Sequence, residues 1–161
     1  MLPAYLGNII PSLLKKFNFL NIPINERLFG SHKTYRGFIF AIIMGMIIFY
    51  IQKSLFQYDF FKNISFINYD EYSLLLGFLL AFGAMFGDLI KSFIKRRLSI
   101  LPGERFIPFD QLDFVIGALV FSYFLVKLSL INIILIIVIS FVLHVIFNHL
   151  GYYLKINKKK W

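Results

Sequence analysis

Cysteine is absent from the 161-residue chain, and charged residues are scarce. Without cysteine there is neither a disulfide framework nor a thiolate metal site, and the redox compartment is left open. Aspartate and glutamate number only 8, against 17 lysines and arginines, and charged residues make up 16% of the chain. With 59% hydrophobic residues, a soluble protein could not cover its surface with polar groups. The scarcity of charge therefore predicts a protein whose main solvent is lipid.

Other signals are missing as well. No charged segment followed by a cleavage site stands near the N-terminus, so we predict no signal peptide. There is no internal repeat and no low-complexity linker, and the length suits one domain, residues 1–161. The net charge of +9 could indicate nucleic acid, but the basic residues cluster at the ends of apolar runs. That placement is typical of membrane topology and headgroup contact, so we predict no nucleic-acid partner.

Long apolar runs indicate the membrane spans, each of which needs roughly 20 mostly apolar residues. The four predicted full spans are Gly37–Gln52 with its extension to Tyr58, Tyr72–Gly87 continuing past Asp88, Phe114–Val126 begun at Asp110, and Leu128–Leu154. A fifth apolar segment, Leu2–Leu14, is short and contains two prolines. We expect it to lie at the interface or to be the inner end of an incomplete span. The predicted fold is an all-α, polytopic membrane protein.

The basic residues orient these spans. Three basic groups alternate with loops that hold few lysines, and the positive-inside rule assigns the groups to the cytoplasmic side of the cell membrane. The groups are Lys15, Lys16, Arg27, Lys33 and Arg36; Lys91, Lys95, Arg96, Arg97 and Arg105; and Lys155, Lys158, Lys159 and Lys160.

The second basic group belongs to the stretch "GDLIKSFIKRRLSILPGERFIPFDQLDF", which carries nine of the chain's 25 charged residues. On a helix, Asp88, Lys91, Ser92 and Lys95 share one face, because they are spaced i, i+3, i+4 and i+7. Asp88 follows 16 apolar residues, about 24 Å of helix, and so lies inside or near the inner edge of the hydrocarbon core. An ionisable group at that depth is costly and indicates a functional site.

The stretch "LPGERFIPFD" then breaks the helix with two prolines and a glycine. The chain re-enters the apolar region with Asp110 and Asp113 on one helix face. We therefore expect Asp88, Asp110 and Asp113 to converge at the mouth of a helical bundle. Carboxylate oxygens suit Mg²⁺, and the surrounding cations would neutralise a polyphosphate. These cations are Lys91, Lys95, Arg96 and Arg105. Phosphoryl-type chemistry needs this combination.

Structural roles are the alternative for each of these residues. Asp110 could cap the third span, with Asp113 completing a pair that resembles a capping box. Asp88 could be a structural partner of Lys91 or Lys95. The arginines that follow could be interfacial anchors, and this is the favoured interpretation for Arg97.

The residues Ser92, Lys95, Arg96, Asp110 and Asp113 form a pattern S-x-x-K-R followed by D-x-x-D. The run "GDLIKSFIKRRLSILPGERFIPFDQLDFVIGA" resembles the signature of the archaeal CDP-archaeol synthases, relatives of the CDP-diacylglycerol synthases. Gln111 and the preceding "IPF" depart from the wider family but fit the archaeal branch. The stretches "PAYLGNIIP", "SHKTYRG" and "HVIFNHLGYYL", with the terminal tryptophan, are similar to the same branch, so the resemblance covers nearly the whole chain.

The resemblance implies transfer of the cytidylyl group of CTP to an unsaturated archaetidic acid, an isoprenoid ether lipid phosphate, with Mg²⁺ as cofactor. The products are a CDP-lipid and pyrophosphate. The lipid phosphate is itself the nucleophile, which agrees with a sequence that lacks cysteine and any suggestive Ser/His pair. The runner-up is a CDP-diacylglycerol synthase acting on phosphatidic acid. A small transporter or structural membrane protein is the third interpretation.

On this resemblance the residues divide by role. Catalytic roles fall to Asp88, Lys91, Lys95, Asp110 and Asp113, with the metal on the three aspartates. Substrate binding falls to Lys33, Thr34, Arg36, Ser92, Arg96, Arg105 and Asn148. Interface anchoring with a threonine cap is the alternative for Lys33, Thr34 and Arg36. For His144 and Asn148 we favour interhelical hydrogen bonds, with Asn148 touching the lipid phosphate as the other possibility.

Overall fold

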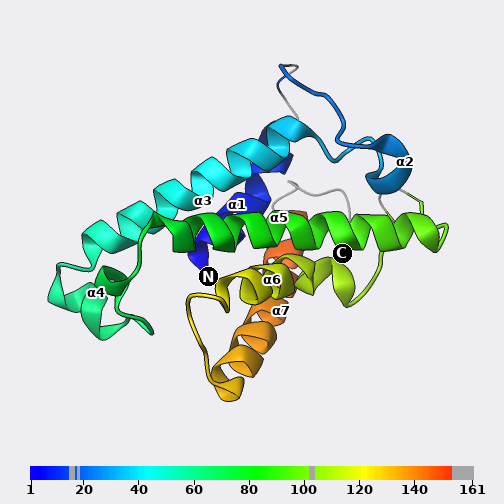
Figure 1. Ribbon diagram of the computed structural model, residues 1–161. Helices are drawn as coiled ribbons and strands as arrows, with labels where there is room; N and C mark the ends of the chain where they lie inside the picture. The colour runs from blue at the N-terminus through cyan, green and yellow to red at the C-terminus, as the bar shows by residue number, and fades with distance from the viewer. Residues whose placement is uncertain (15–16, 18, 102–103, 154–161) are drawn as a thin grey trace.

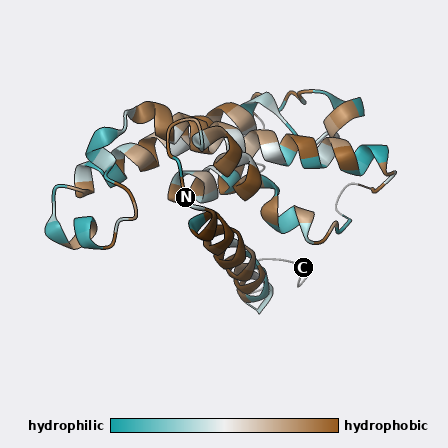
Figure 2. Ribbon diagram, turned by 60° about the horizontal axis from the view of Figure 1, so that its bottom comes forward, coloured by the Kyte–Doolittle hydropathy of each residue, from teal (hydrophilic) through white to brown (hydrophobic). Residues whose placement is uncertain are grey.

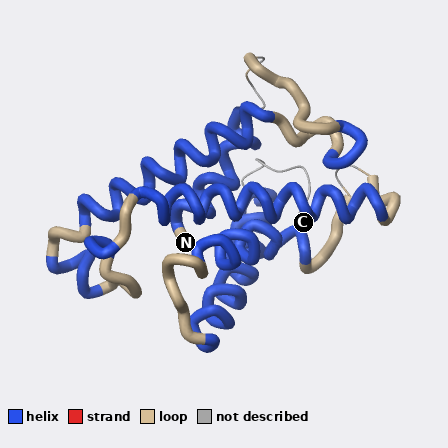
Figure 3. The backbone as a smooth tube through the Cα atoms, in the orientation of Figure 1, coloured by secondary structure: helices blue, strands red, loops and turns tan. Residues whose placement is uncertain are grey.

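The computed structural model describes residues 1–14, 17, 19–101 and 104–153, and in this part of the chain the fold is helical without a strand (Figures 1 and 3). The elements are α1 (Leu2–Leu14), α2 (Glu26–Phe29), α3 (Tyr35–Leu55), α4 (Asp59–Asn63), the short 3₁₀ helix η1 (Tyr69–Glu71), α5 (Leu74–Arg97), α6 (Phe109–Ser122) and α7 (Leu130–Tyr153). The all-α prediction is confirmed. Some of the predictions fall outside the described residues. They concern Lys15 and Lys16, the turn residues Pro102 and Gly103, the end of the last span at Leu154, the basic group at 155–160 and the terminal Trp161.

Within the described residues, three helices, α3, α5 and α7, are long and apolar enough to cross a bilayer. They correspond to three of the four predicted full spans. The fourth, α6, has 14 residues and thus measures about 21 Å, less than the ~30 Å hydrocarbon core. It is shorter than predicted because the helix ends at Ser122 and not at Val126. The N-terminal α1 has the predicted bounds.

Helix α5 lies at the centre and contacts α1, α2, α3 and α6, with α3 and α6 on its two sides in Figure 1. The buried core joins Leu76, Leu80 and Ala84 of α5 to Val115 and Ala118 of α6. The spacing of the α5 residues, i, i+4 and i+8, explains why one face of this helix is buried. The core therefore fixes how α5 is rotated against its neighbour.

The contact between α5 and α6 is a backbone contact. A Cβ added at Gly83 or at Gly117 would meet the carbonyl oxygen of the other glycine, and one added at Gly87 would meet the carbonyl oxygen of Asp113. Small residues allow helix backbones to approach in this way. Since Gly87 precedes Asp88, the same close approach brings the carboxylate-bearing parts of α5 and α6 together.

Helix α7 stands out from the rest of the bundle as a strongly apolar rod (Figure 2). It packs mainly against α6, and a hydrogen bond between the Tyr5 and Ser140 hydroxyl groups ties it to α1. Ser140 is fully buried, although most side chains of α7 are exposed to the surroundings. This polar contact holds the last helix beside the first.

Candidate active site

Three aspartates surround the ammonium group of Lys91 where α5 meets α6. Lys91 Nζ lies 3.0 Å from Asp88 Oδ1, 3.5 Å from Asp110 Oδ1 and 2.8 Å from Asp113 Oδ2. Asp88 and Lys91 come from α5, and the other two carboxylates from the first turns of α6. The convergence predicted for the three carboxylates is thus present, with a lysine nitrogen among them.

Two further lysines complete the cluster. Lys33 Nζ donates a hydrogen bond to Asp88 Oδ2, and Lys95 Nζ lies 3.2 Å from Asp110 Oδ1. The three lysines and three aspartates carry three charges of each sign, so the cluster is neutral. Its side chains are mostly buried, with 5% of Asp113 and 9% of Lys95 exposed. Buried charges require such pairing, because an unpaired ion in a medium of low dielectric constant is strongly destabilising. We call these six residues the Asp–Lys cluster.

Asp110 is held by the turn that precedes α6. Its Oδ2 accepts a hydrogen bond of 2.6 Å from the backbone N–H of Phe106. The cap position of α6 is occupied by Pro108, and no side chain caps the helix there. The alternative in which Asp110 caps the third span is therefore wrong. Asp110 lies in the first turn of α6, and its carboxylate accepts a hydrogen bond from a residue that precedes the helix. The alternative pairing of Asp88 with Lys91 is present, since the two side chains are in contact.

Lys33 is positioned by the start of α3. An isolated antiparallel bridge joins Pro23 to Thr34, and within it the N–H of Ile24 donates to the carbonyl oxygen of Lys33 at 2.8 Å. Thr34 Oγ1 accepts a hydrogen bond from the N–H of Gly37 at 3.2 Å, so it caps α3. The predicted alternative role of Thr34 as a cap is confirmed. Bridge and cap together hold Lys33 against α5.

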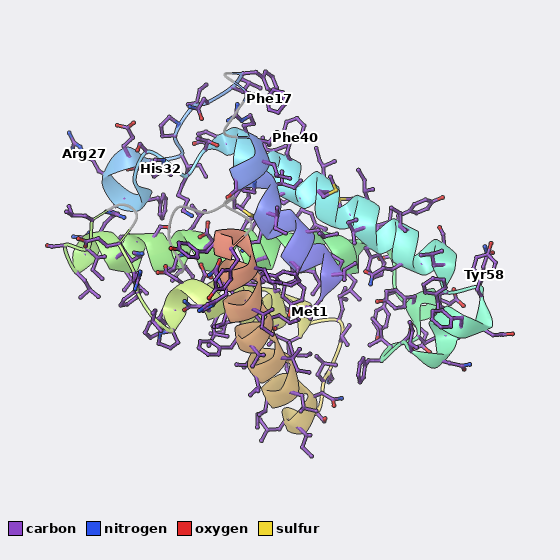
Figure 4. The ribbon with its side chains drawn as sticks, turned by 180° about the vertical axis from the view of Figure 1, so that it is seen from behind. Met1, Phe17, Arg27, His32, Phe40 and Tyr58 are labelled. Carbon is purple, nitrogen blue, oxygen red and sulfur yellow. The ribbon has the colours of Figure 1, made fainter. Side chains whose placement is uncertain are left out.

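A cavity of about 180 Å³ opens beside the Asp–Lys cluster, between α1, the segment before α3, and α5. Lys33, Thr34 and Asp88 line it together with Asn8, Ser12 and His32. His32, labelled in Figure 4, was not predicted, although it immediately precedes Lys33 in the quoted motif. Ser12 gave no recognisable signal, because it lies on a helix that was interpreted as a hydrophobic segment. The cavity gives the cluster a polar opening.

Arg36 does not join the Asp–Lys cluster. The residue is 4% exposed, and Nη1 donates hydrogen bonds to the carbonyl oxygens of Phe17, at 2.5 Å, and Phe19. Nη2 lies 3.4 Å from Asn21 Oδ1. The guanidinium group therefore holds the segment that leads from α1 towards α3.

The other predicted binding residues are Ser92, Arg96, Arg105 and Asn148, which are not members of the Asp–Lys cluster. Ser92 is buried and donates to the carbonyl oxygen of Asp88 at 2.8 Å, within its own helix. Arg96 donates to the carbonyl oxygen of Ile100 at 2.7 Å and lines a second cavity near α2. Arg105 is exposed, and Asn148 is half-buried on α7.

The Asp–Lys cluster contains carboxylate oxygens that could bind a metal ion, but they are not arranged around a common metal position. Among the described residues, no group of three or more His, Cys, Asp or Glu side chains is arranged to hold a metal ion. The donor chemistry nevertheless fits Mg²⁺, which prefers carboxylate oxygens. In the described part of the chain, Asp113 Oδ2 is buried and accepts no hydrogen bond of good geometry, although Lys91 Nζ lies 2.8 Å away. A divalent cation at this oxygen would compete with that ammonium group.

In the part of the chain that the structure describes, three helices long and apolar enough to cross a bilayer define a multi-pass membrane protein, and a buried cluster of charged side chains lies where α5 meets α6. The whole chain, residues 1–161, matches the family model of the CarS-like proteins, described as CDP-archaeol synthase, and the chain belongs to this family. The family predicted from the sequence is confirmed.

Individual relatives agree with the family match. The chain is 36% identical to the CDP-archaeol synthase of Methanocaldococcus jannaschii over 165 residues, covering 100% of this chain and 93% of the relative. It is 35% identical to that of Pyrococcus furiosus, with 100% and 94% covered. A solved structure, described as an intramembrane enzyme for archaeal membrane lipids biosynthesis, superposes with a TM-score of 0.67 at 25% identity, covering 92% of this chain and 89% of that one.

Proposed function

We propose that the chain transfers the cytidylyl group of CTP to an unsaturated archaetidic acid, giving a CDP-archaeol-type lipid and pyrophosphate. The observation that carries this proposal is the Asp–Lys cluster, which gathers six charged side chains at the junction of α3, α5 and α6 in a CDP-archaeol synthase family member. Both substrates carry phosphate groups, and one of them is a membrane lipid. A polar cluster inside an apolar bundle suits that pair.

The reaction needs no protein nucleophile. An oxygen of the lipid phosphate monoester forms a bond to the α-phosphorus of CTP, and the bond from that phosphorus to the oxygen bridging towards the β-phosphorus breaks. Pyrophosphate leaves with the bonding electron pair. Since a phosphate monoester has a second pKa of about 6, the attacking group is already largely ionised near neutral pH. The protein's work is therefore to bind, to orient and to neutralise charge.

Lys33, Lys91 and Lys95 are the proposed phosphate-binding cations. Each is paired with an aspartate in the structure, and a bound triphosphate would offer the ammonium groups further anionic partners. The cavity that contains Lys33 and Asp88 is the proposed entry for the nucleotide. Its position beside α1 and α5 leaves the bilayer-facing sides of the bundle to the lipid tails.

The proposed cofactor is Mg²⁺, held by Asp88, Asp110 and Asp113. When bound, it would neutralise phosphate charge and so favour the attack of one anion on another. The donor chemistry supports this assignment, as does Asp113 Oδ2, which is buried without a hydrogen bond of good geometry. Arg96 and Arg105 are secondary candidates for phosphate contact, and Asn148 for contact with the lipid phosphate.

The proposed site faces the cytoplasm, where CTP is available. The basic residues Lys33, Lys95 and Arg97 lie at the same end of the bundle, the end at which α3 begins and α5 finishes. Such an excess of positive charge is typical of cytoplasmic ends.

The test is purified protein incubated with labelled CTP, Mg²⁺ and an unsaturated archaetidic acid, with labelled lipid as the readout. Asp113→Asn should lower turnover by about 100-fold or more while the protein stays folded. Asp70→Asn, a matched change at an exposed aspartate of η1, should leave turnover unchanged. Wild-type turnover in Asp113→Asn would contradict the metal assignment.

The preferred lipid substrate distinguishes a CDP-archaeol synthase from a CDP-diacylglycerol synthase. A preference for the ether lipid phosphate is expected, and equal or better turnover of ester-linked phosphatidic acid would indicate a CDP-diacylglycerol synthase. A folded protein that forms no CDP-lipid from either substrate would favour the transporter or structural alternative.

A further inference from the structure

The position of Lys91 has a consequence beyond phosphate binding. Its nitrogen lies within 3.5 Å of all three aspartates, at 3.0, 3.5 and 2.8 Å. Among the ion pairs of the described chain, Lys33 and Lys95 each contact a single aspartate. Lys91 is therefore the cation around which the carboxylates are arranged.

Helix packing forces the carboxylates together. The glycine contacts between α5 and α6 bring Gly87, next to Asp88, against the backbone of Asp113, so the backbones that carry the two acidic side chains are held close together. Like charges this close and this buried are stable only with a cation or a proton between them. In the structure a cation fills this position, the ammonium group of Lys91, whose side chain is 15% exposed.

We propose that Lys91 is an internal cation that occupies the carboxylate site of the substrate-free protein and is exchanged for a divalent cation on substrate binding. This inference rests on the proposed function and assigns Lys91 a role that the family match does not. The ammonium group and a metal ion would compete for the same three carboxylates, because both are cations that need these oxygens. Binding of the metal therefore expels the ammonium group, which becomes available to a phosphate oxygen.

The exchange couples the two ligands. A divalent cation that arrives alone must displace Lys91 into a poorly solvated site with no anion to receive it. A triphosphate that arrives with the cation supplies that anion. The coupling has the form of a linkage, in which each ligand strengthens the binding of the other. Lys91 thus disfavours occupation of the carboxylates by metal when no nucleotide is present.

The test measures Mn²⁺ binding to the purified full chain in the absence of CTP and lipid, with the electron paramagnetic resonance signal of free Mn²⁺ as the readout. Lys91→Met should bind Mn²⁺ about tenfold more tightly than the wild type, because the competing cation is gone. Lys127→Met, at an exposed lysine between α6 and α7, should bind Mn²⁺ like the wild type. Adding Asp113→Asn to Lys91→Met should remove most of the gain.

If Lys91→Met does not fold, a charge-balanced double variant is compared with a single variant instead. Lys91→Gln/Asp113→Asn loses one charge of each sign, and it should bind Mn²⁺ more tightly than Asp113→Asn alone. Equal or weaker Mn²⁺ binding on removal of Lys91, in either background, would overturn the proposal. Because neither measurement uses CTP or lipid, its outcome is separate from the outcome of the cytidylyl-transfer assay.

Discussion

At the level of single residues, the Arg36 guanidinium group donates to the backbone carbonyl oxygens of Phe17 and Phe19 and not to the Asp–Lys cluster. Helical spacing and the family motif singled out Asp88, Lys91, Asp110 and Asp113, and the structure brings all four together. Arg36 was grouped with Lys33 as a phosphate ligand because both match the family motif. Its contacts depend on how the segment after α1, with Phe17 and Phe19, folds back against the start of α3. No local sequence pattern encodes that path.

Arg36→Ala should destabilise the protein by about 1–3 kcal/mol, because the carbonyl oxygens of Phe17 and Phe19 lose their donor in a partly buried place. Thermal unfolding in detergent measures this loss. The Michaelis constant for CTP should rise as well, since the segment that holds Lys33 is loosened. Arg105→Ala, at an exposed arginine, should unfold like the wild type. Unchanged unfolding of Arg36→Ala together with lost CTP binding would instead make Arg36 a direct ligand.

At the level of elements, the contact between α5 and α6 decides the geometry of the site. Three glycines leave no room for a methyl group between the two backbones, and the aspartates flank that contact. The helices themselves were predictable from apolar runs, and α1 was predicted to the residue. The short length of α6 was not predictable, because the run Phe114–Val126 contains no charged residue, yet the helix ends at Ser122. The chain leaves the helix inside an apolar run, where composition gives no stop signal.

Gly117→Ala should push α6 away from α5, because the new Cβ would meet the backbone of Gly83 rather than a side chain that could move aside. A loss of about 1–3 kcal/mol in stability is expected, as for other overpacked contacts. Cytidylyl transfer should fall with it, since the carboxylates of the two helices would separate. Ile116→Ala, at the neighbouring and 43% exposed position, serves as the control for unfolding and activity. Wild-type values for Gly117→Ala would show that the helix contact can relax at no cost.

At the level of the whole molecule, composition predicted a lipid-embedded helical protein, and the structure and family match bear this out. The packing of α7 through Tyr5 and Ser140 was beyond the sequence, because the two residues are 135 positions apart and each is an unremarkable hydroxyl in its own helix. The proposed orientation follows from the basic residues alone and predicts opposite exposure for the two ends of the bundle.

The absence of cysteine makes that orientation directly measurable. Phe66→Cys, at a 93% exposed position between α4 and η1, should react with a membrane-impermeant maleimide added to intact cells. Leu101→Cys, exposed beyond the end of α5, should react only after the membrane is permeabilised. The unaltered chain contains no thiol and should stay unlabelled. Labelling of Leu101→Cys in intact cells, with Phe66→Cys protected, would reverse the proposed topology.

The cross-helix ion pairs between Lys91 and the aspartates of α6 also bear on how the chain enters the membrane during synthesis. Helix α6 is short and carries two acidic side chains near its start, and a carboxylate at membrane depth opposes insertion. Helix α5 is synthesised first and brings Lys91, whose ammonium group neutralises part of that charge. The two segments should therefore leave the translocon as a hairpin rather than one after the other, so that the ion pairs that hold the site also admit α6 to the bilayer.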